Sequence, residues 1–156
     1  MLQWLRARCP NTSYAMKLDS DVFVNVPKLV RSLLSAPRSS FITGVIQRRA
    51  QIRVRGELLP AVRDGPGLRF SMDLPSRILK ASLNVKPLYI EDVYVALCLR
   101  ESGVEVSDPP GSAVFFSYSP FLMPHCFWTE VTVVLLENSE LLLESWRTFE
   151  KQLQYC

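Results

Sequence analysis

The chain is organised around the segment Tyr14-Ala15-Met16-Lys17-Leu18-Asp19-Ser20-Asp21-Val22-Phe23-Val24-Asn25. An apolar, strand-like run leads into two aspartates separated by one serine, and a second apolar run carries the chain away. Two carboxylates at the end of a strand can converge on one cation, and hard ions such as Mg²⁺ and Mn²⁺ prefer oxygen ligands. Aspartate is also common in turns because it forms local hydrogen bonds. The segment alone therefore predicts either a cation-binding turn or an ordinary turn.

A second acidic pair opens a predicted helix farther along the chain. Ile90 is followed by Glu91 and Asp92, and the helical pattern runs to Ser102, with Gly103 well suited to the C-terminal cap. Carboxylates in the first turn of a helix are favoured by the exposed N–H groups and the helix dipole. The same place also projects a carboxylate from the edge of a sheet into a cleft. The residues alone leave both roles open.

Helical and strand patterns alternate along the rest of the chain. Apolar periodicity predicts helices over residues 2–8, 27–34, 73–84, 91–102 and 139–153. Strands are predicted at residues 14–18, 22–24, 41–46, 104–106, 113–118 and 130–136. Residues 47–67 show no convincing periodicity. The last helix carries an apolar stripe, interpreted as core packing: Leu142, Trp146, Phe149 and Leu153.

The composition is that of an ordinary globular domain, and the length of 156 residues fits a single one. The net charge of +3 is too small to indicate a nucleic-acid partner. Arginines nevertheless crowd one stretch, which is either a solvated loop or a rim that attracts a nucleotide diphosphate or an anionic acceptor. These arginines are Arg48, Arg49, Arg53, Arg55, Arg63 and Arg69.

The four cysteines allow three pairings, between which the sequence does not choose. They contain no Cys-x-x-Cys spacing, which argues against a zinc site. Asn11-Thr12-Ser13 is an acceptor pattern for N-glycosylation. The residues after Met1 have no apolar core, so neither a signal peptide nor a membrane span is expected there. The one histidine, His125, is interpreted as a surface or loop residue.

Taken together, these blocks resemble the β-1,3-galactosyltransferase family, glycosyltransferase family 31. The resemblance begins with Trp4, Cys9-Pro10 and the segment from Tyr14 to Asn25, which reads Tyr-x-x-Lys, Asp-Ser-Asp, Val-Phe-Val-Asn. Further blocks follow in the family's order, at Phe70-Ser71-Met72-Asp73, Ile90 to Leu99, Cys126, Trp146 and Cys156. The resemblance covers nearly the whole chain.

The resemblance implies a fold and a cellular setting. We expect an α/β fold of the glycosyltransferase A type, a three-layer domain with a mixed sheet whose N-terminal nucleotide-binding strands are missing. Residues 1–156 would then be a partial catalytic domain, from a fragment, an isoform or an incomplete gene model. Full-length members resemble Golgi membrane proteins with a lumenal catalytic domain and an N-terminal anchor, which this chain lacks. Incomplete coverage of the sheet should leave an exposed apolar face.

The resemblance also implies a reaction, the inverting transfer of galactose from UDP-galactose to a glycan acceptor in β-1,3 linkage. Mn²⁺ would neutralise the departing diphosphate as a Lewis acid, with Asp21 as its direct ligand and Asp19 holding the ribose or a metal-bound water. Asp92 corresponds to the general base that deprotonates the acceptor hydroxyl. Glu91 would orient Asp92 or contact the sugar. No covalent intermediate is needed.

The chain departs from the family at two places. Relatives carry a histidine nine residues after the cysteine that corresponds to Cys126, where it resembles a metal ligand, and this chain has Leu135 there. Residues 47–67 are shorter and lack the family's Lys-Trp and Tyr-Pro segments, although Gly65 and Gly67 stand where its glycines do. Two alternatives therefore stay open. One is a non-catalytic relative that binds a full-length paralogue, and the other is a transferase that uses UDP-N-acetylglucosamine.

Overall fold

The structure is a computed structural model that describes residues 1–44, 51–54, 57–60, 67–107, 115–118, 120 and 122–156, with the backbone alone at 51–54 and 57–60. Arg48, Arg49, Arg55, Arg63 and Gly65 lie outside the described residues, and so does the side chain of Arg53.

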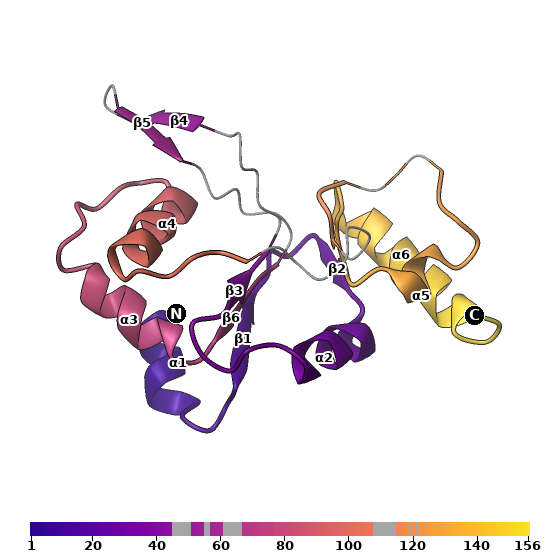
Figure 1. Cartoon of the computed structure of the whole chain (residues 1–156). Helices are drawn as coiled ribbons and strands as arrows, with labels where there is room; N and C mark the ends of the chain where they lie inside the picture. The colour runs from indigo at the N-terminus through magenta and orange to yellow at the C-terminus, as the bar shows by residue number, and fades with distance from the viewer. Residues whose placement is uncertain (45–50, 55–56, 61–66, 108–114, 119, 121) are drawn as a thin grey trace.

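The fold is mixed α/β, as predicted, with helices and strands alternating along the chain (Figure 1). In the first part of the chain the elements are α1 (Leu2–Arg8), β1 (Tyr14–Lys17), β2 (Val22–Val24), α2 (Val26–Leu34), β3 (Ile42–Thr43), β4 (Gln51–Val54) and β5 (Glu57–Pro60). They continue with β6 (Leu68–Ser71), α3 (Leu74–Ala81), α4 (Glu91–Glu101), β7 (Phe115–Phe116), α5 (Phe127–Glu130), β8 (Val133–Leu135) and α6 (Ser139–Gln152).

The described strands form three small sheets. The central sheet has the order β1-β6-β3 and is antiparallel, with Ala15 opposite Phe70 and Thr43 opposite Arg69. The second sheet has the order β2-β8-β7, in which β2 and β8 are antiparallel and β7 and β8 are parallel. The second sheet is therefore mixed. Among the described strands, β4 and β5 pair only with each other.

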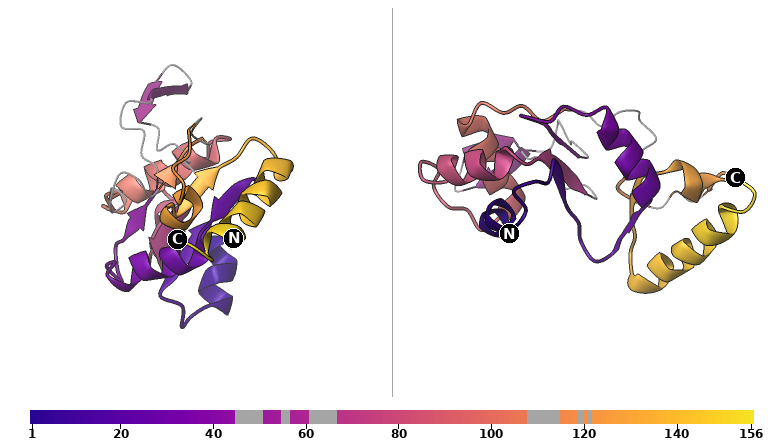
Figure 2. Two further views of the ribbon diagram at one scale, coloured as in Figure 1. Left: turned by 90° about the vertical axis from the view of Figure 1, so that its right-hand side faces the viewer. Right: turned by 90° about the horizontal axis from the view of Figure 1, so that it is seen from below.

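Helices cover both faces of the central sheet, which gives three layers. The view from below in Figure 2 shows α1 and α3 on one side of this sheet and α2 on the other. Because successive side chains of a strand point to opposite faces, Leu68 and Phe70 of β6 face α3 and α4, whereas Arg69 faces α2. The first face carries the larger apolar cluster, in which Phe70 packs with Leu74, Ile78 and Leu99.

The second sheet has its own aromatic core, built with α5 and α6. The ring of Phe23 lies between 4.8 and 5.6 Å, centroid to centroid, from the rings of Trp128, Trp146 and Phe149. Phe23 is fully buried, so this residue of the Val-Phe-Val-Asn block acts as the centre of a core. The cluster fixes α6 on the second sheet and leaves the first face of the central sheet to α1, α3 and α4.

Asn25 joins the two helical regions. Its side-chain oxygen accepts a hydrogen bond from the Lys28 N–H and so caps α2, and its amide nitrogen donates to the Trp128 and Thr129 carbonyls. The side chain is buried and its hydrogen bonds satisfy both ends of the amide. Asn25, the last residue of the segment Tyr14 to Asn25, therefore has a structural role.

The chain has one disulfide among the described residues, between Cys126 and Cys156. It links the residue before α5 to the end of the chain after α6, and it resolves the choice between pairings, since Cys9 and Cys98 are free thiols. Burial raises the pKa of the Cys98 thiol, which keeps it protonated at neutral pH. The described helices, on the other hand, include none with the length and hydropathy needed to cross a bilayer.

Several predicted elements differ from the observed ones. Residues 104–106 form no strand, and the next residue, Ser107, forms an isolated parallel bridge with Thr43. The strand predicted from residue 130 begins at Val133, because Phe127 and Trp128 are drawn into the aromatic core as helix α5. The β4–β5 hairpin was not predicted. Leu153 lies beyond α6 and is exposed, so the core-packing interpretation is wrong for that residue.

Candidate active site

The turn Asp19-Ser20-Asp21 lies where the chain passes from the central sheet to the second sheet. β1 ends two residues before Asp19, and β2 begins directly after Asp21. Asp19 is exposed, whereas Asp21 is half-buried and its backbone carbonyl accepts a hydrogen bond of 3.0 Å from the Leu136 N–H. This hydrogen bond anchors the turn to the end of β8 and so fixes the position of the Asp21 backbone.

Both carboxylates of the turn are available for a ligand. In the part of the chain that the structure describes, neither the Asp19 nor the Asp21 carboxylate has a hydrogen bond or ion pair with another residue. Two carboxylates are a suitable donor set for Mn²⁺ or Mg²⁺, which take the remaining ligands from phosphate and water. Among the described residues, however, neither aspartate belongs to a cluster of three or more close acidic, histidine or cysteine ligands. The described residues therefore offer few ligand atoms for such an ion.

Position 135 lies beside this turn. Leu135 is the last residue of β8 and pairs with Val22, directly after Asp21. The histidine expected from the family would thus stand next to the aspartates, and the leucine in its place offers no ligand atom. The spacing from Cys126 located this position in the sequence, and the strand pairing explains why it matters.

Glu91 and Asp92 form the first turn of α4, as predicted, and Lys17 connects them to the acidic segment. The Lys17 ammonium lies 3.7 Å from the nearer Glu91 carboxylate oxygen and 3.9 Å from that of Asp92. Lys17 is the last residue of β1, two residues before Asp19. The structure therefore brings the start of α4 to the end of β1 from which the Asp-Ser-Asp turn departs.

These partly exposed ion pairs contribute little to stability, because exposed pairs are typically worth below about 1 kcal/mol. Their importance is geometric. Lys17 belongs to the Tyr-x-x-Lys motif, yet no role was predicted for it from the sequence. A charged residue at a strand end has no periodicity that would single it out. The signal that could have done so is its spacing of two residues from Asp19.

A pocket of about 310 Å³ opens beside this ion-pair cluster, and we call it the acid-pair pocket. Lys17, Glu91 and Asp92 supply its charged side, and its apolar wall comes from the first face of the central sheet with α1, α3 and α4. Wall residues include Leu2, Ile42, Leu68, Phe70, Ile78 and Val95. Asp19 and Asp21 do not line this pocket. The candidate base is thus in a pocket, and the candidate metal ligands are on the adjoining turn.

Asp73 of the Phe-Ser-Met-Asp block is structural. Its carboxylate accepts hydrogen bonds from the Ser71 hydroxyl and the Ser40 N–H, and Arg77 lies 3.6 Å away. Burial raises the pKa of Asp73, but these hydrogen bonds and the Arg77 charge outweigh burial and hold the pKa below its ordinary value of 3.8. Ser40 has a positive φ of 53°, and the hydrogen bond to Asp73 supports this conformation.

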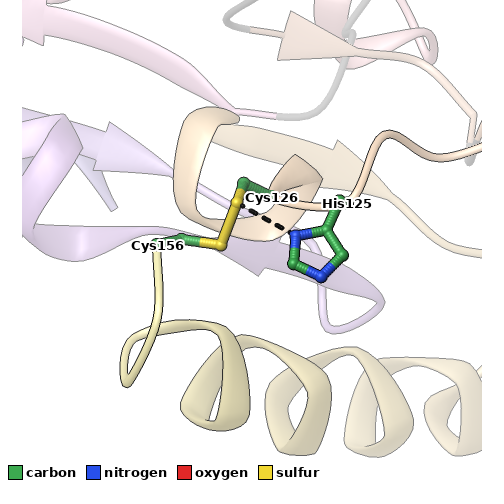
Figure 3. Close-up of side chains that lie close together, drawn as sticks. All are labelled: His125, Cys126 and Cys156. Carbon is green, nitrogen blue, oxygen red and sulfur yellow. Dashed lines mark hydrogen bonds between the residues drawn. A yellow bond between two sulfur atoms is a disulfide. The ribbon is translucent and has the colours of Figure 1, made fainter.

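His125 lies with Cys126 and Cys156, in the one close group of three potential metal ligands that the described residues contain (Figure 3). The two sulfur atoms are joined as a disulfide, so neither is a thiolate that could bind a metal. The exposed imidazole stacks 5.0 Å from the Tyr155 ring, and the His125 carbonyl accepts a hydrogen bond from Gln152. The prediction of a surface histidine is confirmed, and this group holds the end of α6.

Comparison with known proteins agrees with these blocks. A family model described as Galactosyltransferase matches residues 1–110. Beta-1,3-galactosyltransferase 2 of Mus musculus is 36% identical over 161 residues, covering 90% of this chain and 37% of that protein, and its Homo sapiens counterpart is 35% identical with the same coverage. Beta-1,3-galactosyltransferase 1 of Mus musculus is 36% identical over 118 residues, covering 66% of this chain and 36% of that protein. The chain spans little more than a third of the length of these relatives. It belongs to the galactosyltransferase family.

Proposed function

We propose that residues 1–156 form part of the catalytic domain of a hexosyltransferase that transfers galactose from UDP-galactose to a hydroxyl group of a glycan in β-1,3 linkage. The observation that carries the proposal is the contact of Lys17 with the carboxylates of Glu91 and Asp92. It joins the two acidic blocks that the family resemblance assigns to donor and acceptor chemistry. The names of the relatives support the galactosyl group and the linkage. We further propose that the protein works on the lumenal side of the Golgi membrane.

Asp21 and Asp19 would hold the divalent cation, which we propose is Mn²⁺. Bound there, the cation would supply Lewis-acid stabilisation of the leaving diphosphate. Asp21 is the better candidate for the direct ligand, because its half-buried backbone is fixed to β8 through Leu136. Asp19 is exposed and is suited to a ribose hydroxyl or a metal-bound water.

Asp92 would act as the general base. It lies in the first turn of α4 on the charged side of the acid-pair pocket, so a hydroxyl entering the pocket can reach its carboxylate. Glu91, beside it and more exposed, would orient Asp92 or contact the sugar. General-base catalysis typically contributes about 10²–10⁴-fold to a rate. Asp92→Asn should therefore lower sugar transfer by that factor while UDP binding persists.

The test is UDP-galactose turnover by the purified chain with Mn²⁺, for the wild type and for Asp92→Asn. Glu101→Gln is the matched control, because it neutralises an exposed carboxylate at the other end of the same helix. A parallel assay with UDP-N-acetylglucosamine decides between the two donors. Turnover that is equal in the wild type and Asp92→Asn would remove Asp92 from the mechanism, and no turnover with either donor would contradict catalysis by this chain.

The metal assignment is tested separately by Mn²⁺ titration. Asp21→Ala should abolish binding, whereas Leu135→His should strengthen it by about tenfold, since one added ligand on the neighbouring strand completes a three-ligand set. Leu135→Gln is the control for a polar residue of similar size that is a poorer ligand. Tight Mn²⁺ binding that survives Asp21→Ala would place the cation elsewhere.

The second candidate is a non-catalytic relative that binds a full-length paralogue. Two observations favour it: Leu135 removes a ligand atom, and α2 exposes the apolar stripe Val26, Val30 and Leu34, with Leu34 82% exposed. Residues spaced by four lie on one helical face, so the stripe is continuous. Co-purification with a full-length paralogue, lost in Val30→Glu, would support this candidate. A monomeric, inactive chain that binds no paralogue would contradict it.

A further inference from the structure

Arg69 is a buried cation that the proposed reaction does not use. It lies in the middle strand of the central sheet, opposite Met16 on one side and Thr43 on the other, and only 1% of its surface is exposed. The prediction that the arginine-rich stretch is a solvated loop is therefore wrong for this residue. Its neighbours Leu68 and Phe70 line the acid-pair pocket, so Arg69 points to the opposite face of the sheet, toward α2.

The surroundings of Arg69 satisfy only part of its guanidinium group. The group lies 4.4 Å from the centre of the Phe115 ring, and Nη1 donates a hydrogen bond of 2.8 Å to the Ser32 hydroxyl. Nε and Nη2 have no hydrogen-bond partner, and no carboxylate among the described residues forms an ion pair with the side chain. Burial lowers the pKa of Arg69 to about 10, which still leaves it charged at neutral pH.

The two unsatisfied atoms define one edge of the guanidinium. Nε–H and the adjacent Nη2–H point in parallel, and this edge is one of the forks with which arginine binds the two oxygens of a carboxylate or phosphate. One face of the planar guanidinium group already lies against the Phe115 ring, and Nη1 already donates a hydrogen bond to Ser32. The partner that the side chain lacks is therefore a negatively charged acceptor that presents two oxygen atoms on one side.

A second pocket lies on this side of the sheet, and Arg69 is one of its lining residues; we call it the Arg69 pocket. It measures about 280 Å³ and is lined by Ser32, Ser35, Ala36, Pro37, Phe41, Arg69 and Ser107. The polar side chains among its described lining residues are hydroxyls and the guanidinium, and none of these residues has a carboxylate that would repel an anion. The volume is several times the roughly 30 Å³ that a water molecule occupies in the liquid, which leaves room for a small oxyanion.

We propose that the Arg69 pocket binds a small oxyanion, a phosphate or carboxylate group, through the guanidinium group of Arg69, whose buried Nε and Nη2 lack an acceptor. The Ser32 hydroxyl positions the guanidinium, because it accepts from Nη1 while it donates to the Leu29 carbonyl. The Ser35 hydroxyl provides a further donor at the rim. Among the described residues the site shares none with the acid-pair pocket, and it lies on the other face of the sheet, so its anion binding can be tested separately from the proposed transfer reaction.

The test measures binding of inorganic phosphate and of acetate to the purified chain by calorimetry and by the shift in melting temperature. Chloride at the same ionic strength serves as the reference. Wild type should bind at least one of the two oxyanions, and the one that binds identifies whether the natural group is a phosphate or a carboxylate. Arg69→Lys should weaken binding by at least tenfold, because an ammonium keeps the charge but lacks the fork. Arg69→Met should abolish it.

Arg77→Met is the matched control, since Arg77 lies on α3 outside the Arg69 pocket, and its oxyanion binding should equal that of the wild type. If Arg69→Met does not fold, Arg69→Lys and Ser35→Ala carry the test, and Ser35→Ala should weaken binding a few-fold. Oxyanion binding that is the same in Arg69→Lys as in the wild type would overturn the proposal. So would a wild type that responds to neither phosphate nor acetate beyond the chloride reference.

Discussion

The two faces of the central sheet differ in chemistry although the same strands build both. The face toward α3 and α4 is apolar around Phe70 and ends in the ion pairs of Lys17 with Glu91 and Asp92. The face toward α2 contains Arg69 with two unsatisfied donors. On β6 these environments are only one residue apart, because side chains alternate across a sheet. A strand of four residues can thus support a core and an acidic pocket on one side and a cationic pocket on the other.

The largest effect expected from this difference is on stability. Phe70 is 2% exposed in the apolar cluster, so Phe70→Ala should lower the free energy of unfolding by about 3–5 kcal/mol. Met16→Ala, at a half-buried position on the α2 face, should cost only about 1–2 kcal/mol because less apolar surface is lost. Denaturant unfolding of both variants compares the faces. Equal losses would mean that the α2 face is as tightly packed as the other.

A smaller effect is expected at the ion pairs of Lys17, at the edge of the face toward α3 and α4. Lys17→Met removes the cation between Glu91 and Asp92 but keeps the length of the side chain. We expect sugar transfer to fall by about tenfold, equivalent to about 1.4 kcal/mol, because the two carboxylates lose the group that positions them. Stability should change by less than about 1 kcal/mol, since the pairs are partly exposed. Turnover and unfolding measured on one preparation separate these outcomes. A large stability loss would make Lys17 a folding residue instead.

The smallest effect is a pH dependence at the end of β6. The pKa of Asp73 is held below its ordinary value, so its contribution to stability is complete at neutral pH and is lost as the pH falls from about 3.8 through the lowered value. Asp73→Asn should be less stable than the wild type by up to about 1 kcal/mol at pH 7, and the difference should shrink below pH 3.8. Thermal unfolding across this range measures it. A difference that does not depend on pH would contradict the charge-based explanation.

The sequence predicted those features that depend on local signals. Helix α4 begins at Glu91, and Gly103 follows it with a positive φ of 65°. The features that were missed either lack a local signal or depend on contacts between distant residues. No periodicity marks the β4–β5 hairpin, which is local, whereas the conformation of residues 127–130 depends on contacts with rings on β2 and α6. Nor can spacing alone select Cys126 and Cys156 as partners, since that requires α6 to fold back onto the second sheet.

The residues of the candidate site, too, were predicted only where a local motif marks them. The motifs identified Asp19, Asp21, Glu91 and Asp92 as candidates, and their roles remain predictions. The tertiary structure adds Lys17, which shows how the two blocks meet. Arg69 was visible in the sequence only as one arginine among several. Its burial follows from its place in β6, the middle strand of the central sheet, and no strand was predicted at those residues.

The Asp-Ser-Asp turn is also the covalent link between two separately cored sheets, one packed around Phe70 and the other around Phe23. A cation bound at that link would be sensitive to the angle between the sheets, because Asp21 is anchored to the end of β8 in the second sheet and Asp19 follows β1 of the central sheet. By thermodynamic reciprocity, the affinity for the proposed metal and the relative orientation of the sheets would then influence each other. Substitutions in the aromatic core around Phe23, which contains no proposed metal ligand, should therefore change the Mn²⁺ affinity measured by titration.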